Sequence, residues 1–321
     1  TWLDGRARMT PWNRDIFTIA NSSAARVDRF AKLKSMGVSW GGCVENRAAP
    51  YDVTDDPPTA TAKSAGASDY ASMFAPYFWP DEPDGGDYAN DYVTDKAGTG
   101  WKARQQDDSK YSQDYKKDRY GETFRAAAGS YQYGPNAGCT MAPMIRLTNN
   151  LQSIKDAIDG MKAVGTTNIP EGLVWGWHTL SPNQPLEDGR PYGSEHLRKV
   201  IILMTDGQNT FLDARDGNNK NNSDYTGLGY IWQNMLGITS GSSSERTAAM
   251  DDRLKELCTN AKKKKIEIYT ILEEESSTAS STLLSGCASS PSKFYNVQNV
   301  STLGVAFDAI AGSITNMRIS H

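Results

Sequence analysis

Leu197–Thr210 reads LRKVIILMTDGQNT, and this stretch decides the fold class. Within it, Val200–Met204 is an unbroken apolar run, which is typical of one buried strand in a parallel sheet. The run ends at Thr205-Asp206-Gly207, a turn that would lift a carboxylate above the carboxyl edge of the sheet, where open α/β sheets bind their ligands. Upstream, Gly165-Thr166-Thr167-Asn168 places hydroxyl groups and an amide at a helix start. A hydroxyl and a carboxylate brought together there could hold a hard divalent cation.

Helical and strand patterns alternate around this run. Leu151, Ile154, Ile158 and Met161 recur at helical spacing, which predicts an amphipathic helix over Asn150–Val164. The other expected elements of this region are a strand at Met144–Leu147, a helix from Pro170 towards Leu180, a helix through Met250, Leu254, Leu257 and Ala261, a strand at Ile266–Leu272, a short helix at Leu283 and Leu284, a strand at Phe294–Val297 and a last helix capped by Ser301. This order predicts an α/β fold with a mainly parallel sheet and helices on both faces.

The first part of the chain has a different character. A short helix is expected over Ser23–Met36, with Val27, Phe30 and Leu33 facing inward, and a strand or extended segment follows at Val38–Val44. From Pro50 to about Gly138 the periodicity disappears, and turn-forming residues alternate with many aromatic ones. The aromatic content favours ordered irregular structure over disorder. We therefore expect two parts: an irregular region at 1–142 and an α/β region at 143–321.

Composition excludes several classes of function. The 321 residues are enough for a sizeable core, and 38% of them are hydrophobic. A formal net charge of -4 gives no reason to expect nucleic acid or an anionic membrane surface as a partner. No apolar stretch approaches the roughly 20 residues that span a bilayer.

Four cysteines indicate the compartment. Cys43, Cys139, Cys258 and Cys287 show no zinc-type spacing, and an even number in so polar a chain favours two disulfides and an oxidising environment. The sequence alone leaves the connectivity open. We favour Cys258–Cys287, because both residues would flank the last strands, and Cys43–Cys139 then follows by elimination; four reduced thiols are the alternative.

Acidic residues gather in the irregular region. They are Asp81, Glu82, Asp84 and Asp87, with Asp91 and Asp95 beyond. They could bind calcium, although their spacing is not that of an EF-hand, or two of them could serve a glycoside hydrolase whose aromatic residues, such as Trp79 and Trp101, stack on sugars. The favoured interpretation is a solvated acidic loop. Nucleophilic catalysis has little support, because neither His178 nor His196 has a Gly-x-Ser-x-Gly elbow or a cysteine partner.

The order from Met144 onward resembles a von Willebrand factor A domain. That resemblance matches Asp206, in the TDG turn, and Thr167, in the GTTN turn, to metal-site residues of the family. A third family element, Asp-x-Ser-x-Ser, does not occur in the chain; the nearest stretch, Asp107–Tyr111, differs at its fifth position.

Further motifs resemble TadG-like proteins, which are pilus-assembly components of the bacterial tight-adherence (Tad/Flp) system. They are Trp40–Arg47, Phe78–Asp84, Gly134–Cys139, Thr167–Ile169, Gly172–Trp177, Leu180–Pro182, Leu283–Ser289 and Met317-Arg318. The resemblance implies a von Willebrand A domain with a long insertion, which this chain enters after the membrane anchor and the first strand or strands.

The resemblance also implies a function. We expect a non-enzymatic, periplasmic or otherwise extracytoplasmic module that binds a protein partner in the pilus-assembly machinery and meets the membrane only through the missing anchor. Asp206 and Thr167 would form an incomplete metal site, and Mg²⁺ or Ca²⁺ bound there would gate the binding of the partner. The alternatives are a carbohydrate-active hydrolase that uses the acidic, aromatic-rich region, and a structural envelope subunit without metal.

Overall fold

The structure, a computed structural model, describes residues 29–58, 71–85, 90–95, 100–112, 134–214, 219–273 and 277–316. The chain forms two compact units. Unit 1 comprises residues 1–52, 56–166 and 211–243, and unit 2 comprises residues 53–55, 167–210 and 244–321. The boundary expected after residue 142 marks the end of an insertion in the sequence. The two compact units do not test that boundary, so it stays a prediction.

A three-stranded parallel sheet lies at the centre of unit 2. Its strands are β3 (Val200–Thr205), β4 (Glu267–Glu273) and β5 (Phe294–Val297), in that spatial order. β4 pairs on both sides and its residues 268–272 are buried, as expected for an apolar run in the middle of a parallel sheet. The α/β class with a mainly parallel sheet is therefore confirmed.

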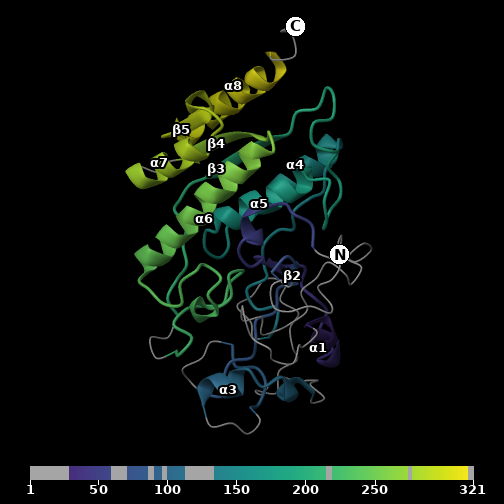
Figure 1. The fold of residues 1–321 in the computed structure, drawn as a ribbon, viewed down its shortest axis with the longest axis vertical. Coiled ribbons are helices and arrows are strands. Elements are labelled where there is room, and N and C mark those ends of the chain that lie inside the picture. The colour runs from purple at the N-terminus through teal and green to yellow at the C-terminus, as the bar shows by residue number, and fades with distance from the viewer. Residues whose placement is uncertain are drawn as a thin grey trace. The chain divides into compact units, whose positions relative to one another are not determined.

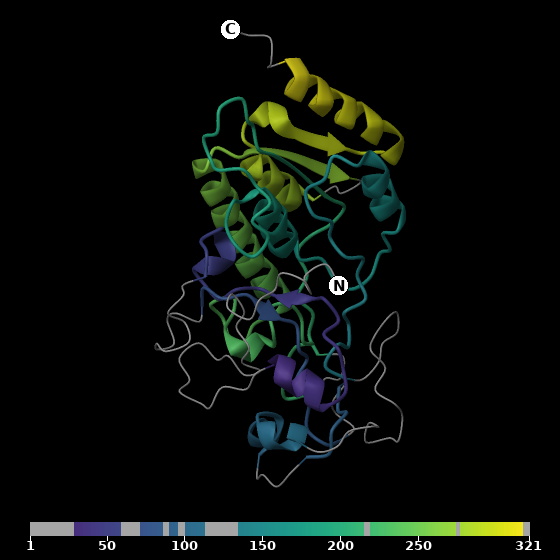
Figure 2. The ribbon, with the colours of Figure 1, turned by 90° about the vertical axis from the view of Figure 1, so that its right-hand side faces the viewer.

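Helices cover both faces of this sheet. They are α5 (Ile169–Leu180), α6 (Ser243–Lys263), α7 (Thr278–Cys287) and α8 (Leu303–Asn316). Figure 1 labels these elements, and Figure 2 shows α8 on one face of the strands and the other three helices on the opposite face. Tyr269 and Ile271 pack towards α8 with Ile310, whereas Thr270 points the other way and donates to the carbonyl of Leu284 in α7. Because successive side chains of a strand point to opposite faces, β4 contributes to the packing on both faces of the sheet.

Local capping explains where the helices begin. The side chain of Asn168 accepts from the backbone N–H of Glu171 at the start of α5, and Ser277 caps α7 in the same way. The expected Ser301 cap is wrong. Asn299 caps instead, because a short 3₁₀-helix (Val300–Thr302) precedes α8 and its first turn is where the free N–H groups lie.

Unit 1 has little regular structure. Its described helices and strands are α1 (Arg29–Ser35), β1 (Val44–Glu45), β2 (Ala75–Pro76), α3 (Trp101–Gln105) and α4 (Leu151–Asp159). The other 3₁₀-helices in the described part of the chain are Tyr51–Val53, Asp108–Ser112, Ile231–Gln233 and Pro291–Lys293. β1 and β2 pair as a short antiparallel sheet, and two aromatic clusters form the core of unit 1. One gathers Phe78, Tyr92 and Tyr111, and the other Trp79 and Tyr230.

Some expected elements differ from the structure. Met144–Leu147 forms no strand, and the segment expected at Val38–Val44 is reduced to β1, because its neighbours bond through side chains and turns. α4 matches the predicted helix, with Asn150 as cap and Gly160 as its end, but none of its residues is buried. The expected helix over Ser23–Met36 is seen as α1 with Leu33 buried, while its first residues lie outside the described part of the chain.

Candidate functional site

The strand-end turn Thr205-Asp206-Gly207 lies at the carboxyl end of β3, as the sequence predicts. Thr205 is the last strand residue, and its hydroxyl accepts a hydrogen bond of 3.3 Å from the N–H of Gly207. This bond closes the turn locally, so the side chain of Asp206 is left exposed to solvent. A carboxylate is therefore displayed at the edge of the parallel sheet where α/β folds bind ligands.

The loop continues to Thr210, whose N–H donates to the carbonyl of Thr167 at 2.9 Å. This bond brings the two sequence-predicted loops together at one edge of unit 2. Thr167 is partly exposed, and the capping role belongs to its neighbour Asn168. Thr167 therefore does not cap α5, which is the structural role that would compete with ligand binding at this residue.

Asn209 fixes the loop to its surroundings. It is 2% exposed, and its Oδ1 accepts from the N–H of Ile169 at 2.9 Å. Its Nδ2 donates to Oδ1 of Asp251 at 2.8 Å, and its backbone carbonyl accepts from the hydroxyl of Thr247 at 2.9 Å. One residue therefore joins the β3 loop to the start of α5 and to α6. Such cross-linking holds a binding loop in one conformation before a ligand arrives.

A cavity of about 190 Å³ opens beside this loop, within unit 2. Its lining comes from the first turn of α5, the turn after β3, the first half of α6 and α7. The lining residues are Ile169, Gly207, Gln208, Ser244, Thr247, Ala248, Asp251, Ala279, Ser280, Leu283 and Leu284. Partial burial raises the pKa of Asp251, and the hydrogen bond from Asn209 opposes that rise.

The sequence does not single out Asn209 or Asp251. Asn209 follows Gln208 in a polar loop, and nothing in its type separates a buried amide from an exposed one. Asp251 stands beside Asp252 in a helix, and only the helical phase of the apolar residues Met250 and Leu254 places it near the buried face. That phase is the one available signal.

The residues present do not make a complete metal centre by themselves. In the described ranges, no group of three or more Asp, Glu, His or Cys side chains is placed to hold an ion. Asp206 and Thr167 would supply two oxygens, whereas Mg²⁺ and Ca²⁺ take about six or more. A cation at this edge would need further oxygens from water or from a partner.

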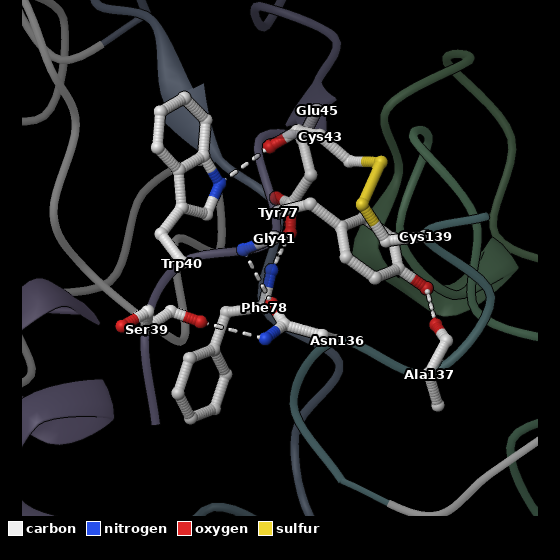
Figure 3. The surroundings of a disulfide bond; sticks show 10 residues. All are labelled: Ser39, Trp40, Gly41, Cys43, Glu45, Tyr77, Phe78, Asn136, Ala137 and Cys139. Atoms are coloured by element: carbon white, nitrogen blue, oxygen red, sulfur yellow. Dashed lines mark hydrogen bonds between the residues drawn. A yellow bond between two sulfur atoms is a disulfide. The ribbon is translucent and has the colours of Figure 1, made fainter. Parts of the chain in front are cut away.

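Both expected disulfides are formed. Cys258 in α6 joins Cys287 at the end of α7, and both are buried. Cys43 joins Cys139 in unit 1, where Figure 3 shows the bridge beside Tyr77, whose hydroxyl donates to the carbonyl of Ala137 at 3.0 Å. Disulfides are typical of proteins in oxidising, extracytoplasmic compartments.

The disulfide region of unit 1 is tightly packed. Asn136 bridges two turns, since its Oδ1 accepts from Gly41 N–H at 3.0 Å and its Nδ2 donates to the carbonyl of Ser39 at 2.8 Å (Figure 3). A Cβ at Gly41 would lie 3.1 Å from the Asn136 side chain and from the Cys139 sulfur. The turn next to the bridge therefore has no room for a larger residue.

The expected solvated acidic loop is wrong for its central residues. Asp81, Glu82 and Asp91 are all buried. Asp81 pairs with Lys110 at 2.6 Å, and its Oδ1 also accepts from the N–H of Tyr92 at 2.6 Å. Burial raises the pKa of Asp81 to about 8, against the opposing effect of Lys110.

Glu82 is engaged in the same way. It accepts from Tyr230 OH at 2.8 Å, from Asn221 Nδ2 at 3.0 Å and from Asn90 N–H at 2.7 Å. Two of these partners, Asn221 and Tyr230, lie 139 and 148 residues away, so the acidic stretch alone could not reveal them. Asp87 lies outside the described residues. The described carboxylates of this acidic stretch belong to unit 1, and none of them lines the cavity of unit 2.

No protein-family model matches the chain, and no curated protein matches it either. Two solved structures resemble it. The vWF domain of the type V pili tip protein Mfa5 from Porphyromonas gingivalis is 16% identical over 55% of this chain and 76% of that one, with a TM-score of 0.36. The pilus adhesin SpaC from Lactobacillus rhamnosus GG is 16% identical over 51% of this chain and 21% of that one, with a TM-score of 0.33.

No helix in the described part of the chain is long and apolar enough to cross a bilayer.

Proposed function

We propose that this chain is a non-enzymatic module of the bacterial envelope that binds a protein partner during pilus assembly or adhesion, in the manner of TadG-like proteins of the Tad/Flp system. The observation that carries the proposal is the loop Thr205–Thr210. It is held against Thr167 and by Asn209, and it presents Asp206 to solvent at the carboxyl edge of the sheet. Loops that a rigid scaffold holds at the surface are where binding residues are concentrated.

The burial and the bonding of the other polar groups support a role without catalysis. Asp81 and Glu82, two of the acidic residues of unit 1 that could have served a hydrolase, are buried against Lys110 and Tyr230. The cavity of about 190 Å³ is below the roughly 300–1,000 Å³ that usually hold a small-molecule substrate. His178 is buried in α5 and stacks edge-on against Trp175, as a structural histidine does. A carbohydrate-active hydrolase is thus the weaker candidate.

A divalent cation, Mg²⁺ or Ca²⁺, belongs to the proposal as a bridge. Asp206 and Thr167 would provide the chain's oxygens, and a carboxylate of the partner with water would complete the shell. In such an arrangement the affinity for the partner depends on the cation, while the chain alone binds it weakly. The competing possibility is a structural envelope subunit that works without metal.

The test is complementation of a strain that lacks this gene. We expect the wild-type chain to restore piliation, and Asp206→Ala to fail while folding normally, because the Asp206 side chain is exposed. Asp252→Asn is the control, since its carboxylate is 73% exposed on α6 and belongs to another surface. Normal pili with Asp206→Ala would favour the metal-free subunit, and normal pili in the deletion strain would end the proposal.

The cation is tested separately on the purified protein. Partner binding should weaken in EDTA and return with Mg²⁺ or Ca²⁺, and Asp206→Ala should lose this response. Equal binding with EDTA and with either ion would remove the cation from the proposal and leave partner binding in place.

A further inference from the structure

The cavity beside the β3 loop has a composition that suits one kind of ligand. Ile169, Leu283 and Leu284, from α5 and α7, contribute apolar lining. Asp251 and Thr247, both from α6, contribute polar lining. A lining that combines apolar side chains with a single carboxylate matches a side chain with a methylene stem and a cationic head.

The size of the cavity indicates a single side chain. A volume of about 190 Å³ is too small for a cofactor or an oligosaccharide, for which pockets of roughly 300–1,000 Å³ are usual. The cavity is partly open to solvent, and Gly207 and Gln208 belong both to the loop that displays Asp206 and to the lining. A partner that covers the loop would therefore have a side chain within reach of the cavity.

The charge of the lining favours a cation over an anion. Asp251 is the one charged side chain among the described residues that line the cavity. Ala279 and Ser280 lie in the first turn of α7, where a helix end attracts negative charge. The Asp251 carboxylate already supplies that charge close by, so an entering carboxylate would be repelled.

The geometry of Asp251 favours lysine over arginine. Its Oδ1 is engaged by Nδ2 of Asn209 at 2.8 Å, and this is the hydrogen bond that the structure records for the carboxylate within the described chain. A guanidinium binds best to two carboxylate oxygens at once, whereas an ammonium is a point charge that needs one. Thr247 donates its hydroxyl to Asn209, and its oxygen can also accept from an ammonium.

We infer that this cavity is a specificity pocket that receives a lysine side chain of the protein partner, with Asp251 as its counter-charge. The inference rests on the proposed protein-binding function and deepens it: the exposed loop provides the docking edge, and the pocket selects which partner segment docks. Neither Asp206 nor a divalent metal ion takes part in the pocket itself.

The probe is N-acetyl-lysine methylamide, titrated into the isotope-labelled full chain and followed by amide chemical shifts. We expect saturable shifts at Gln208, Thr247 and Ser280. N-acetyl-norleucine methylamide, which keeps most of the stem and lacks the charge, should bind about 10- to 100-fold more weakly, the effect of a charge-assisted hydrogen bond. The arginine analogue should be weaker than lysine, and the glutamate analogue should not bind.

The deciding variant is Asp251→Asn, which keeps an oxygen for Asn209 and removes the charge. It should weaken the lysine probe by about 10- to 100-fold, while Asp252→Asn should not change its affinity. Equal binding of norleucine and lysine, binding of glutamate, or equal losses in the two variants would overturn the inference. The probe needs neither partner nor cation, so a negative result leaves the Asp206 complementation test standing, and lysine binding can succeed where that test fails.

Discussion

At the scale of single residues, Asn209 has the largest effect on the shape of the candidate site. Its side chain satisfies the buried N–H of Ile169 and one oxygen of Asp251 at the same time. An N–H left without a partner inside a protein loses its water and gains nothing in return. The conformation of the exposed TDG turn thus depends on a residue that is itself buried.

Asn209→Ala is therefore expected to lower the free energy of unfolding by about 2–3 kcal/mol, because it removes two buried hydrogen bonds. It should also raise the pKa of Asp251 further, because the amide that stabilises the ionised carboxylate is lost and only the charge of Lys255 then opposes the effect of burial. Urea denaturation measures the first effect and a carboxyl-carbon NMR titration the second. Gln208→Ala, with an exposed side chain, is the control. An unchanged Asp251 titration would show that Asn209 does not act on this carboxylate.

At the scale of elements, the sequence predicts unit 2 much better than unit 1. β4 and α5 follow from an apolar run and from a Pro near the helix start, because burial by neighbouring layers of the same sheet reinforces these local patterns. In unit 1 the stabilising pairs are polar and distant, such as Glu82 with Tyr230, which are 148 residues apart. Spacing along the chain carries no information about such a pair. An acidic stretch therefore looks solvated when it is in fact buried.

The candidate site shows the same division. The sequence predicts the edge of the sheet at which the loops of Asp206 and Thr167 lie, because the carboxyl end of a parallel strand is a property of the fold class, while the metal-binding role of the two residues stays a prediction. It does not predict the cavity, since that depends on how α6 and α7 pack and on which face of α6 carries Asp251. Periodicity gives the face of a helix, but not the empty volume next to it.

The two disulfides join elements and should contribute unequally to stability. The loop closed by Cys43–Cys139 has a sequence separation of 96, and that closed by Cys258–Cys287 has one of 29. By chain entropy, the first restricts the unfolded chain by about 4–5 kcal/mol and the second by about 3–4 kcal/mol. Replacing each pair by alanine should lower the unfolding transition of its own unit in that order. The intact mass before and after reduction provides the control for two bridges, and a larger loss from the Cys258–Cys287 pair would contradict the entropic account.

At the scale of the whole molecule, the two units are not consecutive in the sequence. Residues 53–55 belong to unit 2 although the segments on both sides of them belong to unit 1. Asp55 is fully buried in unit 2, where the hydroxyls of Ser181 and Tyr192 donate to its Oδ2. The carbonyl of Val53 accepts from Nδ2 of Asn260 in α6 at 3.1 Å. Three residues from the irregular part of the chain thus complete the α/β unit.

This interleaving makes a prediction about cutting the chain after residue 142. A fragment of residues 143–321 would contain all three strands of the parallel sheet but would lack Asp55, so that the buried hydroxyl of Ser181 and the partly buried hydroxyl of Tyr192 would lose their acceptor. We expect this fragment to unfold at a lower urea concentration than unit 2 does in the full chain, and with lower cooperativity. Asp55→Ala in the full chain should reproduce about 2–4 kcal/mol of that loss, since it removes the same acceptor from a buried site. Asp56→Ala is the matched control, because the side chain of Asp56 is exposed and the residue belongs to unit 1. A fragment as stable as unit 2 in the full chain would show that the α/β region is self-sufficient and that residues 53–55 are only attached to it.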